Sequence, residues 1–266
     1  MTRDEPYARI RALLARVAVP YARVGFRAAT AFGVLRYRMT RRWPSVAEVR
    51  ALFPHLESRA ASHTAARISA LEERNRVLVR MLRGGGIDAV HSFSAVAESL
   101  AAFHGPAVLA TFHTGAVFAI GPVLSRLQSP VLAFRGGQQF TPYDSLQTES
   151  TRGDEQQRAA ALHRALQHLR LGGLVAIALD AVPDRGIETR CLGRSLRLAP
   201  GAFALARWAH APVIPLVARW TPSGIRVETG DSLDAPQEAA TWLERYLLSS
   251  PSETTLGLLR TLLAAS

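Results

Sequence analysis

The stretch Ala107-Val108-Leu109-Ala110-Thr111-Phe112-His113-Thr114-Gly115 is a short apolar run that ends in a histidine and two turn-forming residues. Continuous apolar runs of this length are typical of buried β-strands, and a helical pattern follows at residues 116–127. The same pattern, an apolar run that ends in a polar residue, recurs twice. The run 131–134 ends at Arg135, and the run 174–179 ends at Asp180. This alternation predicts an α/β fold with a mostly parallel central sheet flanked by helices.

Three polar residues, His113, Arg135 and Asp180, directly follow predicted strands. Ligands of parallel α/β sheets gather at the carboxyl ends of the strands, so we expect a site there. Histidine accepts protons near neutral pH, which makes His113 the candidate general base. Structural interpretations stand beside these: local capping or packing for His113, a solvated charge for Arg135, and a turn or helix cap for Asp180.

The elements around these strands follow from apolar periodicity and from glycine and proline. Residues 1–40 are expected to be basic helix. Helices are also expected within 45–85, ending at Gly84-Gly85-Gly86, and at 156–171 and 200–210. We expect a hairpin at 186–198, a strand at 212–217 and a polar loop over 138–155. No linker divides residues 46–266, which we interpret as one domain preceded by a basic segment at 1–45.

The N-terminal segment carries most of the net charge of +11. Residues 1–50 contain eleven arginines against three acidic residues, and apolar residues such as Leu14, Val17 and Tyr21 recur at helical spacing. Such a helix can lie among anionic lipid headgroups with its arginines on phosphates, while Arg16 and Arg23 interrupt any membrane span. An amphipathic helix docked on the domain is the equally weighted alternative. The segment lacks the aromatic and basic interleaving that binds bases, so we expect no nucleic-acid partner.

Composition excludes several chemistries. All 32 basic residues are arginine, which removes lysine nucleophiles and Schiff bases. The single cysteine, Cys191, allows neither an internal disulfide nor a multi-cysteine zinc site, and we expect it to be packed. The chain lacks a G-x-S-x-G elbow, which argues against a serine hydrolase. His163 and His168 are not at the i, i+4 spacing of a helical metal pair, so we expect no metal and no bound cofactor.

The run Ala110-Thr111-Phe112-His113-Thr114-Gly115 resembles the first block of the lysophospholipid acyltransferase superfamily. Later motifs follow in an order similar to the late lipid A acyltransferase branch, and the resemblance covers about residues 50 to 220. They are Arg135, Arg152-Gly153, the glycine pair and strand of 171–180, Leu192-Gly193-Arg194, and the stretches 199–206 and 211–215.

The resemblance implies a glycerol-3-phosphate acyltransferase-like fold and a peripheral enzyme on the cytoplasmic face of a bacterial inner membrane. Such an enzyme moves a fatty acyl group from acyl carrier protein or coenzyme A to a hydroxyl or amine of a lipid or glycolipid. His113 would be the general base, Arg135 and Arg152 would bind phosphate, and Asp180 would orient these arginines. Backbone amides near Thr114-Gly115, or an arginine, would stabilise the oxyanion.

One position departs from the family pattern. The family pairs its histidine with an acidic residue five positions on, and here that position is Phe118. The carboxylate fixes the imidazole tautomer and stabilises the imidazolium. Three alternatives follow: Asp180 or a carbonyl near Thr114 substitutes, the histidine acts alone, or the chain is a catalytically silent protein that binds lipid or a partner. A substitute acid beside His113 would disfavour the silent alternative.

The C-terminal segment 249–266 lacks the aromatic and basic ending expected of lipid A enzymes. This favours a related glycolipid or a specialised acceptor over lipid A itself.

Overall fold

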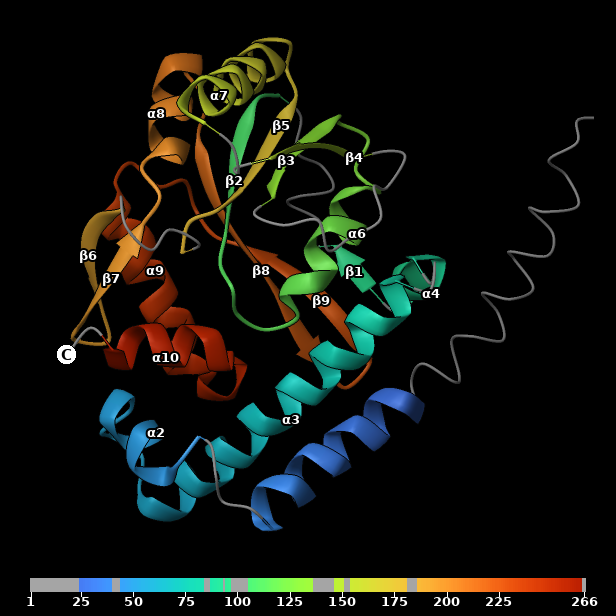
Figure 1. Cartoon of the computed structure of the whole chain (residues 1–266), viewed down its shortest axis with the longest axis vertical. Coiled ribbons are helices and arrows are strands. Elements are labelled where there is room, and N and C mark those ends of the chain that lie inside the picture. The colour runs from blue at the N-terminus through green and yellow to red at the C-terminus, as the bar shows by residue number, and fades with distance from the viewer. Residues whose placement is uncertain are drawn as a thin grey trace, which may run out of the picture.

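The computed structural model describes residues 24–39, 44–83, 87–92, 94–96, 105–135, 146–150, 154–180 and 186–264. Its centre is a seven-stranded sheet with the order β1-β9-β8-β2-β5-β3-β4 (Figure 1). The strands are β1 (Ser94–Val96), β2 (Ala107–Thr111), β3 (Val131–Arg135), β4 (Leu146–Ser150), β5 (Leu174–Ala178), β8 (Val213–Thr221) and β9 (Gly224–Thr229). Every neighbouring pair is parallel except β8 with β9. The predicted α/β fold with a mostly parallel sheet is therefore confirmed.

The sheet is covered on both faces, which explains its continuous apolar strands. Along β2, Val108 and Ala110 join one core cluster while Ala107 and Leu109 join the other. The first cluster also contains residues of α2 (Val46–Leu52), α7 (Glu155–Arg170), α8 (Gly201–Ala209), α9 (Pro236–Ser249), α10 (Leu256–Ala264) and the hairpin β6 (Ile187–Cys191)–β7 (Arg194–Leu198). The second contains residues of α4 (Ile87–Ser92), η1 (Val117–Ala119) and α6 (Ile120–Leu124). The long helix α3 (Ser58–Arg83) contributes to both.

Several boundaries differ from the sequence prediction. Residues 138–155 were expected as loop, but β4 pairs in parallel with β3 at the sheet edge. Its polar composition hid it, since an edge strand is less buried than a central one. The helix expected at 116–127 is shorter and consists of η1 followed by α6, and the Ser125 hydroxyl donates to the Pro122 carbonyl (2.7 Å) where α6 ends. Strand β8 continues to Thr221 because antiparallel β9 pairs with its second half.

A helix over residues 24–39, dark blue and unlabelled in Figure 1, lies along α3. The two backbones approach closely at Gly33, where a Cβ atom would lie 2.5 Å from the Ala70 Cα. Arg36 forms an ion pair with Glu73 of α3 (3.1 Å). The rest of the predicted basic segment, residues 1–23 and 40–43, lies outside the described residues. Within the residues that the structure describes, no helix is long and apolar enough to cross a membrane.

Candidate active site

His113 and Asp180 meet because two neighbouring strands end in register. Strands β2 and β5 are parallel, and Thr111 pairs with Ala178 at their carboxyl ends. The next amide continues the pairing, since Leu179 N donates to Thr111 O (2.9 Å). His113 and Asp180 each lie two residues beyond the paired positions, so the register places them side by side. This is the sheet edge at which the sequence predicted a site.

The Asp180 carboxylate binds both the ring and the backbone of His113. Its Oδ1 lies 2.8 Å from His113 Nδ1, and its Oδ2 accepts from the His113 amide at 2.9 Å. An ionised carboxylate only accepts hydrogen bonds, so Nδ1 carries the proton and Nε2 keeps its lone pair. The Asp180 side chain is 2% exposed while that of His113 is 47% exposed. A buried acid thus orients an imidazole that solvent or a substrate can reach.

The electrostatics agree with this geometry. The hydrogen bond to Asp180 raises the pKa of His113 above its ordinary value; partial burial opposes the shift, and the negative charge of Asp180 adds to it. A higher pKa makes the imidazole a stronger proton acceptor. The pair therefore has the tautomer and the basicity that a general base requires.

The loop after His113 is closed by hydrogen bonds within the protein. Thr114 N donates to Phe112 O (2.8 Å), and Gly115 N donates to Glu253 O (2.8 Å). Ala116 N donates to Ala218 O (2.6 Å). These three amides were expected as candidate oxyanion donors. Because each already has an internal acceptor, the structure does not present them to a substrate. The Thr114 hydroxyl is also buried and donates to Glu253 O (2.6 Å).

A C-terminal segment supports this loop, and the sequence did not single it out. The segment η2 (Pro251–Glu253) supplies the carbonyl that accepts from Gly115 N, and the Thr255 hydroxyl donates to the His113 carbonyl. From α3, Asn75 Nδ2 donates to Gly115 O (2.9 Å). Asn75 lies within the charged run Glu72-Glu73-Arg74-Asn75-Arg76, so its residue type did not distinguish it in the sequence.

A buried carboxyl group and a nearby arginine lie next to the same loop. The Glu253 side chain is nearly inaccessible, and its Oε2 has no hydrogen-bond partner among the described residues. Burial raises the pKa of Glu253 to about 7, although the positive charge of Arg74 opposes the shift. The Arg74 guanidinium lies 5.1 Å from the Trp220 ring centroid. The Glu253 carboxyl group lies close to the loop, since a Cβ atom at Gly115 would lie 2.9 Å from its Oε2.

The remaining predicted residues have different positions. Arg135 is the last residue of β3, at the same carboxyl edge as the histidine, and its side chain is outside the described atoms. Arg152 also lies outside the described residues. Phe118 lies in η1 and packs against the second core cluster. Cys191 is buried, and burial raises the pKa of its thiol to about 12, which makes it a poor nucleophile.

No group of three or more potential metal ligands occurs within the residues that the structure describes. The chain matches no family model, and no curated protein matches it. A solved structure with detectable similarity is that of the 1-acyl-sn-glycerophosphate (LPA) acyltransferase PlsC from Thermotoga maritima. It has 13% sequence identity and a TM-score of 0.39, and the alignment covers 88% of this chain and 95% of that chain. At this distance, the interpretation of the site depends on its own geometry.

Proposed function

We propose that this chain is a member of the lysophospholipid acyltransferase superfamily and transfers a fatty acyl group from a thioester to a lipid or glycolipid. Acyl carrier protein or coenzyme A carries the acyl group, and a hydroxyl or an amine accepts it. The observation that carries the proposal is the His113–Asp180 pair at the carboxyl ends of β2 and β5. Asp180 supplies the carboxylate that Phe118 does not, which disfavours the catalytically silent alternative.

The chemistry follows from the orientation of the imidazole. Nε2 of His113 takes the proton of the acceptor hydroxyl as its oxygen attacks the thioester carbonyl. Asp180 stabilises the imidazolium, which then gives the proton to the departing thiolate as the carbon–sulfur bond breaks. Charge on the carbonyl oxygen needs donors, and since the loop amides are already bonded, an arginine is the proposed source. Arg135 and Arg152 are proposed to bind phosphate, on the acceptor or on the phosphopantetheine arm.

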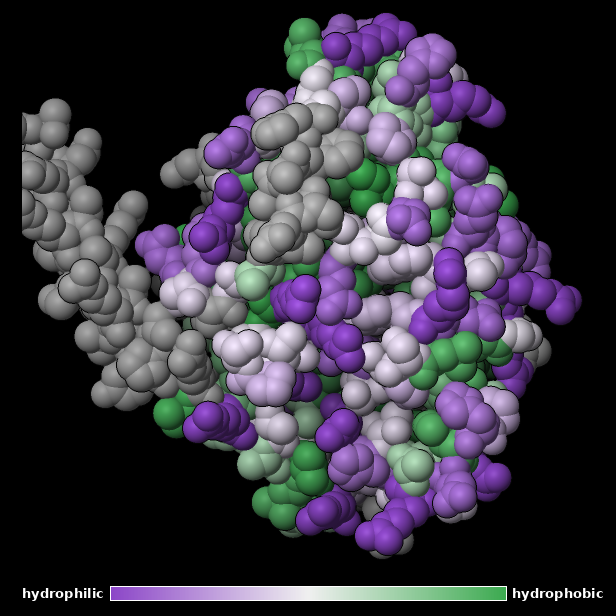
Figure 2. Space-filling view, turned by 180° about the vertical axis from the view of Figure 1, so that it is seen from behind, coloured by the Kyte–Doolittle hydropathy of each residue, from purple (hydrophilic) through white to green (hydrophobic). Residues whose placement is uncertain are grey.

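The membrane is the proposed location of the reaction, by peripheral attachment to the cytoplasmic face of a bacterial inner membrane. Helix 24–39 supports this because it exposes Val24 (62%), Phe32 (56%), Leu35 (54%) and Met39 (76%). These are four of the eight large hydrophobic residues that are exposed in the described part of the chain. By contrast, hydrophilic and hydrophobic residues are interspersed over the face seen in Figure 2. Apolar side chains flanked by Arg27 and Arg38 suit the headgroup layer.

The acceptor class is proposed from the sequence motifs, which resemble the lipid A branch. The C-terminal segment supports a related glycolipid or specialised acceptor instead of lipid A. In this structure that segment forms η2 and α10, and it supports the His113 loop.

Acyl transfer from radiolabelled acyl carrier protein and acyl-coenzyme A to a total lipid extract tests the proposal. Wild type should form a labelled lipid, His113→Ala should not, and His163→Ala should behave as wild type because His163 is an exposed residue of α7. Labelled product that persists in His113→Ala would contradict the assignment of the base. Vesicle binding without transfer from any donor would support the silent alternative.

A further inference from the structure

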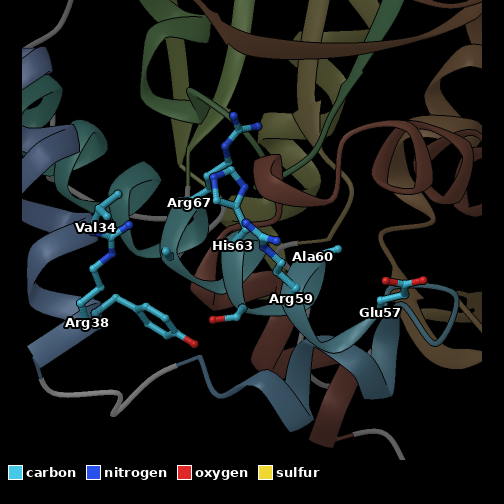
Figure 3. Close-up of a pocket in the computed structure, with 10 residues that line it drawn as sticks. Val34, Arg38, Glu57, Arg59, Ala60, His63 and Arg67 are labelled. Carbon is cyan, nitrogen blue, oxygen red and sulfur yellow. The ribbon is translucent and has the colours of Figure 1, made fainter.

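A groove of about 710 Å³ lies between helix 24–39 and α3, away from His113. Figure 3 shows Val34 and Arg38 entering it from helix 24–39, opposite Arg59, His63 and Arg67 of α3. The three α3 residues are spaced at i, i+4 and i+8, so they project from one face of the helix. Basic side chains therefore line the groove on both of its walls, helix 24–39 and α3.

Arg38, Arg59 and Arg67 have no hydrogen-bond or ion-pair partner within the described residues, in contrast to the neighbouring Arg36. Arg36 is committed to the helix interface through its ion pair with Glu73, which also pairs with Arg76 (2.8 Å). Among the residues that the structure describes, none forms a hydrogen bond or ion pair with Arg38 or Arg59. Three cations gathered around one groove repel one another, and an anion would relieve that repulsion.

The lining suggests which anion fits. An arginine fork binds phosphate through two parallel hydrogen bonds, and three arginines line this groove. The acidic lining residue, Glu57, lies at the far end of the groove from helix 24–39 (Figure 3). Val34, Ala60 and Ala66 provide apolar surface between the charges. A phosphate joined to a less polar backbone matches this combination.

The apolar surface next to the groove favours a phospholipid of a bilayer as the source of the phosphate. Val34 and Arg38 also line a shallow depression that contains Leu35, one of the exposed apolar residues of helix 24–39. The groove is therefore continuous with an apolar surface suited to the headgroup layer. We propose that this groove binds the phosphate of an anionic phospholipid headgroup in a membrane, through Arg38, Arg59 and Arg67. The proposal rests on the membrane location proposed above, and not on the acyl-transfer reaction.

Sedimentation with vesicles of phosphatidylcholine, alone or mixed with phosphatidylglycerol, tests this site in the full chain. Replacing Arg38, Arg59 and Arg67 together with Gln should weaken binding to the mixed vesicles by about tenfold or more, because each basic residue at an anionic surface contributes measurably. Binding to pure phosphatidylcholine should change little. The matched control replaces Arg80, Arg83 and Arg158, three exposed arginines that lie outside the groove and outside helix 24–39. It should retain most of the affinity.

Equal losses in the two triple variants would overturn the proposal, because diffuse attraction between charges would then suffice. Unchanged binding in the groove variant would overturn it as well. A third variant, with Lys at the three groove positions, keeps the charge and removes the forks, so it should bind between wild type and the Gln variant. Inorganic phosphate that binds wild type and not the Gln variant, without displacing wild type from the vesicles, would assign the groove to free phosphate instead. Because vesicle binding is measured without any acyl donor, a wild-type chain that fails to transfer acyl groups leaves this comparison intact.

Discussion

Asp180 accepts hydrogen bonds from both the backbone amide and the ring Nδ1 of His113, at 2.9 and 2.8 Å. The two residues are 67 positions apart and meet because β2 and β5 end in register. The double contact fixes the main chain of the histidine as well as its ring. An acid from the neighbouring strand thus occupies the role that the sequence leaves empty at Phe118.

The first prediction concerns Asp180. Asp180→Asn should lower kcat for acyl transfer by roughly 10²- to 10⁴-fold, since the amide neither stabilises the imidazolium nor selects the tautomer. A circular dichroism spectrum like that of wild type would show that the fold survives. Asp88→Asn is the control, because Asp88 is an exposed residue of α4 and its replacement should leave kcat unchanged. Wild-type activity in Asp180→Asn would contradict the proposed orienting role.

The pH dependence of the same variant is a second prediction. A general base acts in its neutral form, so activity should fall as pH decreases through the pKa of His113. Asp180 raises that pKa above the ordinary value of 6.5, so the wild-type midpoint should lie above it. In Asp180→Asn the main cause of the shift is lost, and the midpoint of kcat/KM should move to lower pH. A midpoint that does not move would mean that another group titrates.

The strands of the site could be predicted because their signal is local. Each is a short apolar run that ends in a polar residue, and the positions of His113 and Asp180 followed directly. Their contact could only be offered as one of several alternatives. It depends on which strands are neighbours and on the register between them, which are tertiary properties that a pattern along one strand does not contain.

The support of the loop was missed for a similar reason. Glu253 acts through its backbone carbonyl and Thr255 through a hydroxyl directed at another carbonyl. Neither contact can be predicted from the type of residue in the sequence, because every residue has a carbonyl and threonines are common. The internal acceptors of Gly115 N and Ala116 N, Glu253 O and Ala218 O, were hidden for the same reason, because they come from segments distant in the sequence.

Thr255 offers a third prediction. Thr255→Val removes the hydroxyl that donates to the His113 carbonyl, and should lower kcat by about tenfold with KM nearly constant. The free energy of unfolding should fall by about 1 kcal/mol. Thr255→Ser retains the hydroxyl and should restore kcat. Thr261→Val, which removes a hydroxyl that donates to Gly257 O within α10 (3.1 Å), is the control. A failure of Ser to restore activity would exclude a role for the hydroxyl.

The fourth prediction tests the close approach of the loop to β8. Gly115 has φ +58°, and a Cβ atom there would lie 2.2 Å from the Ala218 carbonyl oxygen. Gly115→Ala should therefore reduce the free energy of unfolding by more than about 2 kcal/mol. Gly257→Ala, in α10 with open space around it, should stabilise by up to about 1 kcal/mol. Urea denaturation of both variants measures the contrast, and similar values would contradict the packing described.

The last prediction follows from the buried carboxyl group of Glu253. Burial raises its pKa from 4.5 to about 7 in the folded protein. A raised carboxyl pKa means that the folded state holds the proton more tightly than the unfolded state. The contribution of this group to stability is therefore greatest below the unfolded pKa. It declines as pH rises from 4.5 to about 7, and it levels off above that range.

Glu253→Gln removes the titration and keeps a side chain of similar size. The variant should gain stability relative to wild type as pH rises through this window, by about 3 kcal/mol at most, since each unit of pKa shift corresponds to about 1.4 kcal/mol. The slope due to His113 is present in both proteins and cancels in the comparison. Urea denaturation at several pH values across the window gives the difference. A constant difference between the two proteins would show that Glu253 is already ionised where the fold buries it, held so by the positive charge of Arg74.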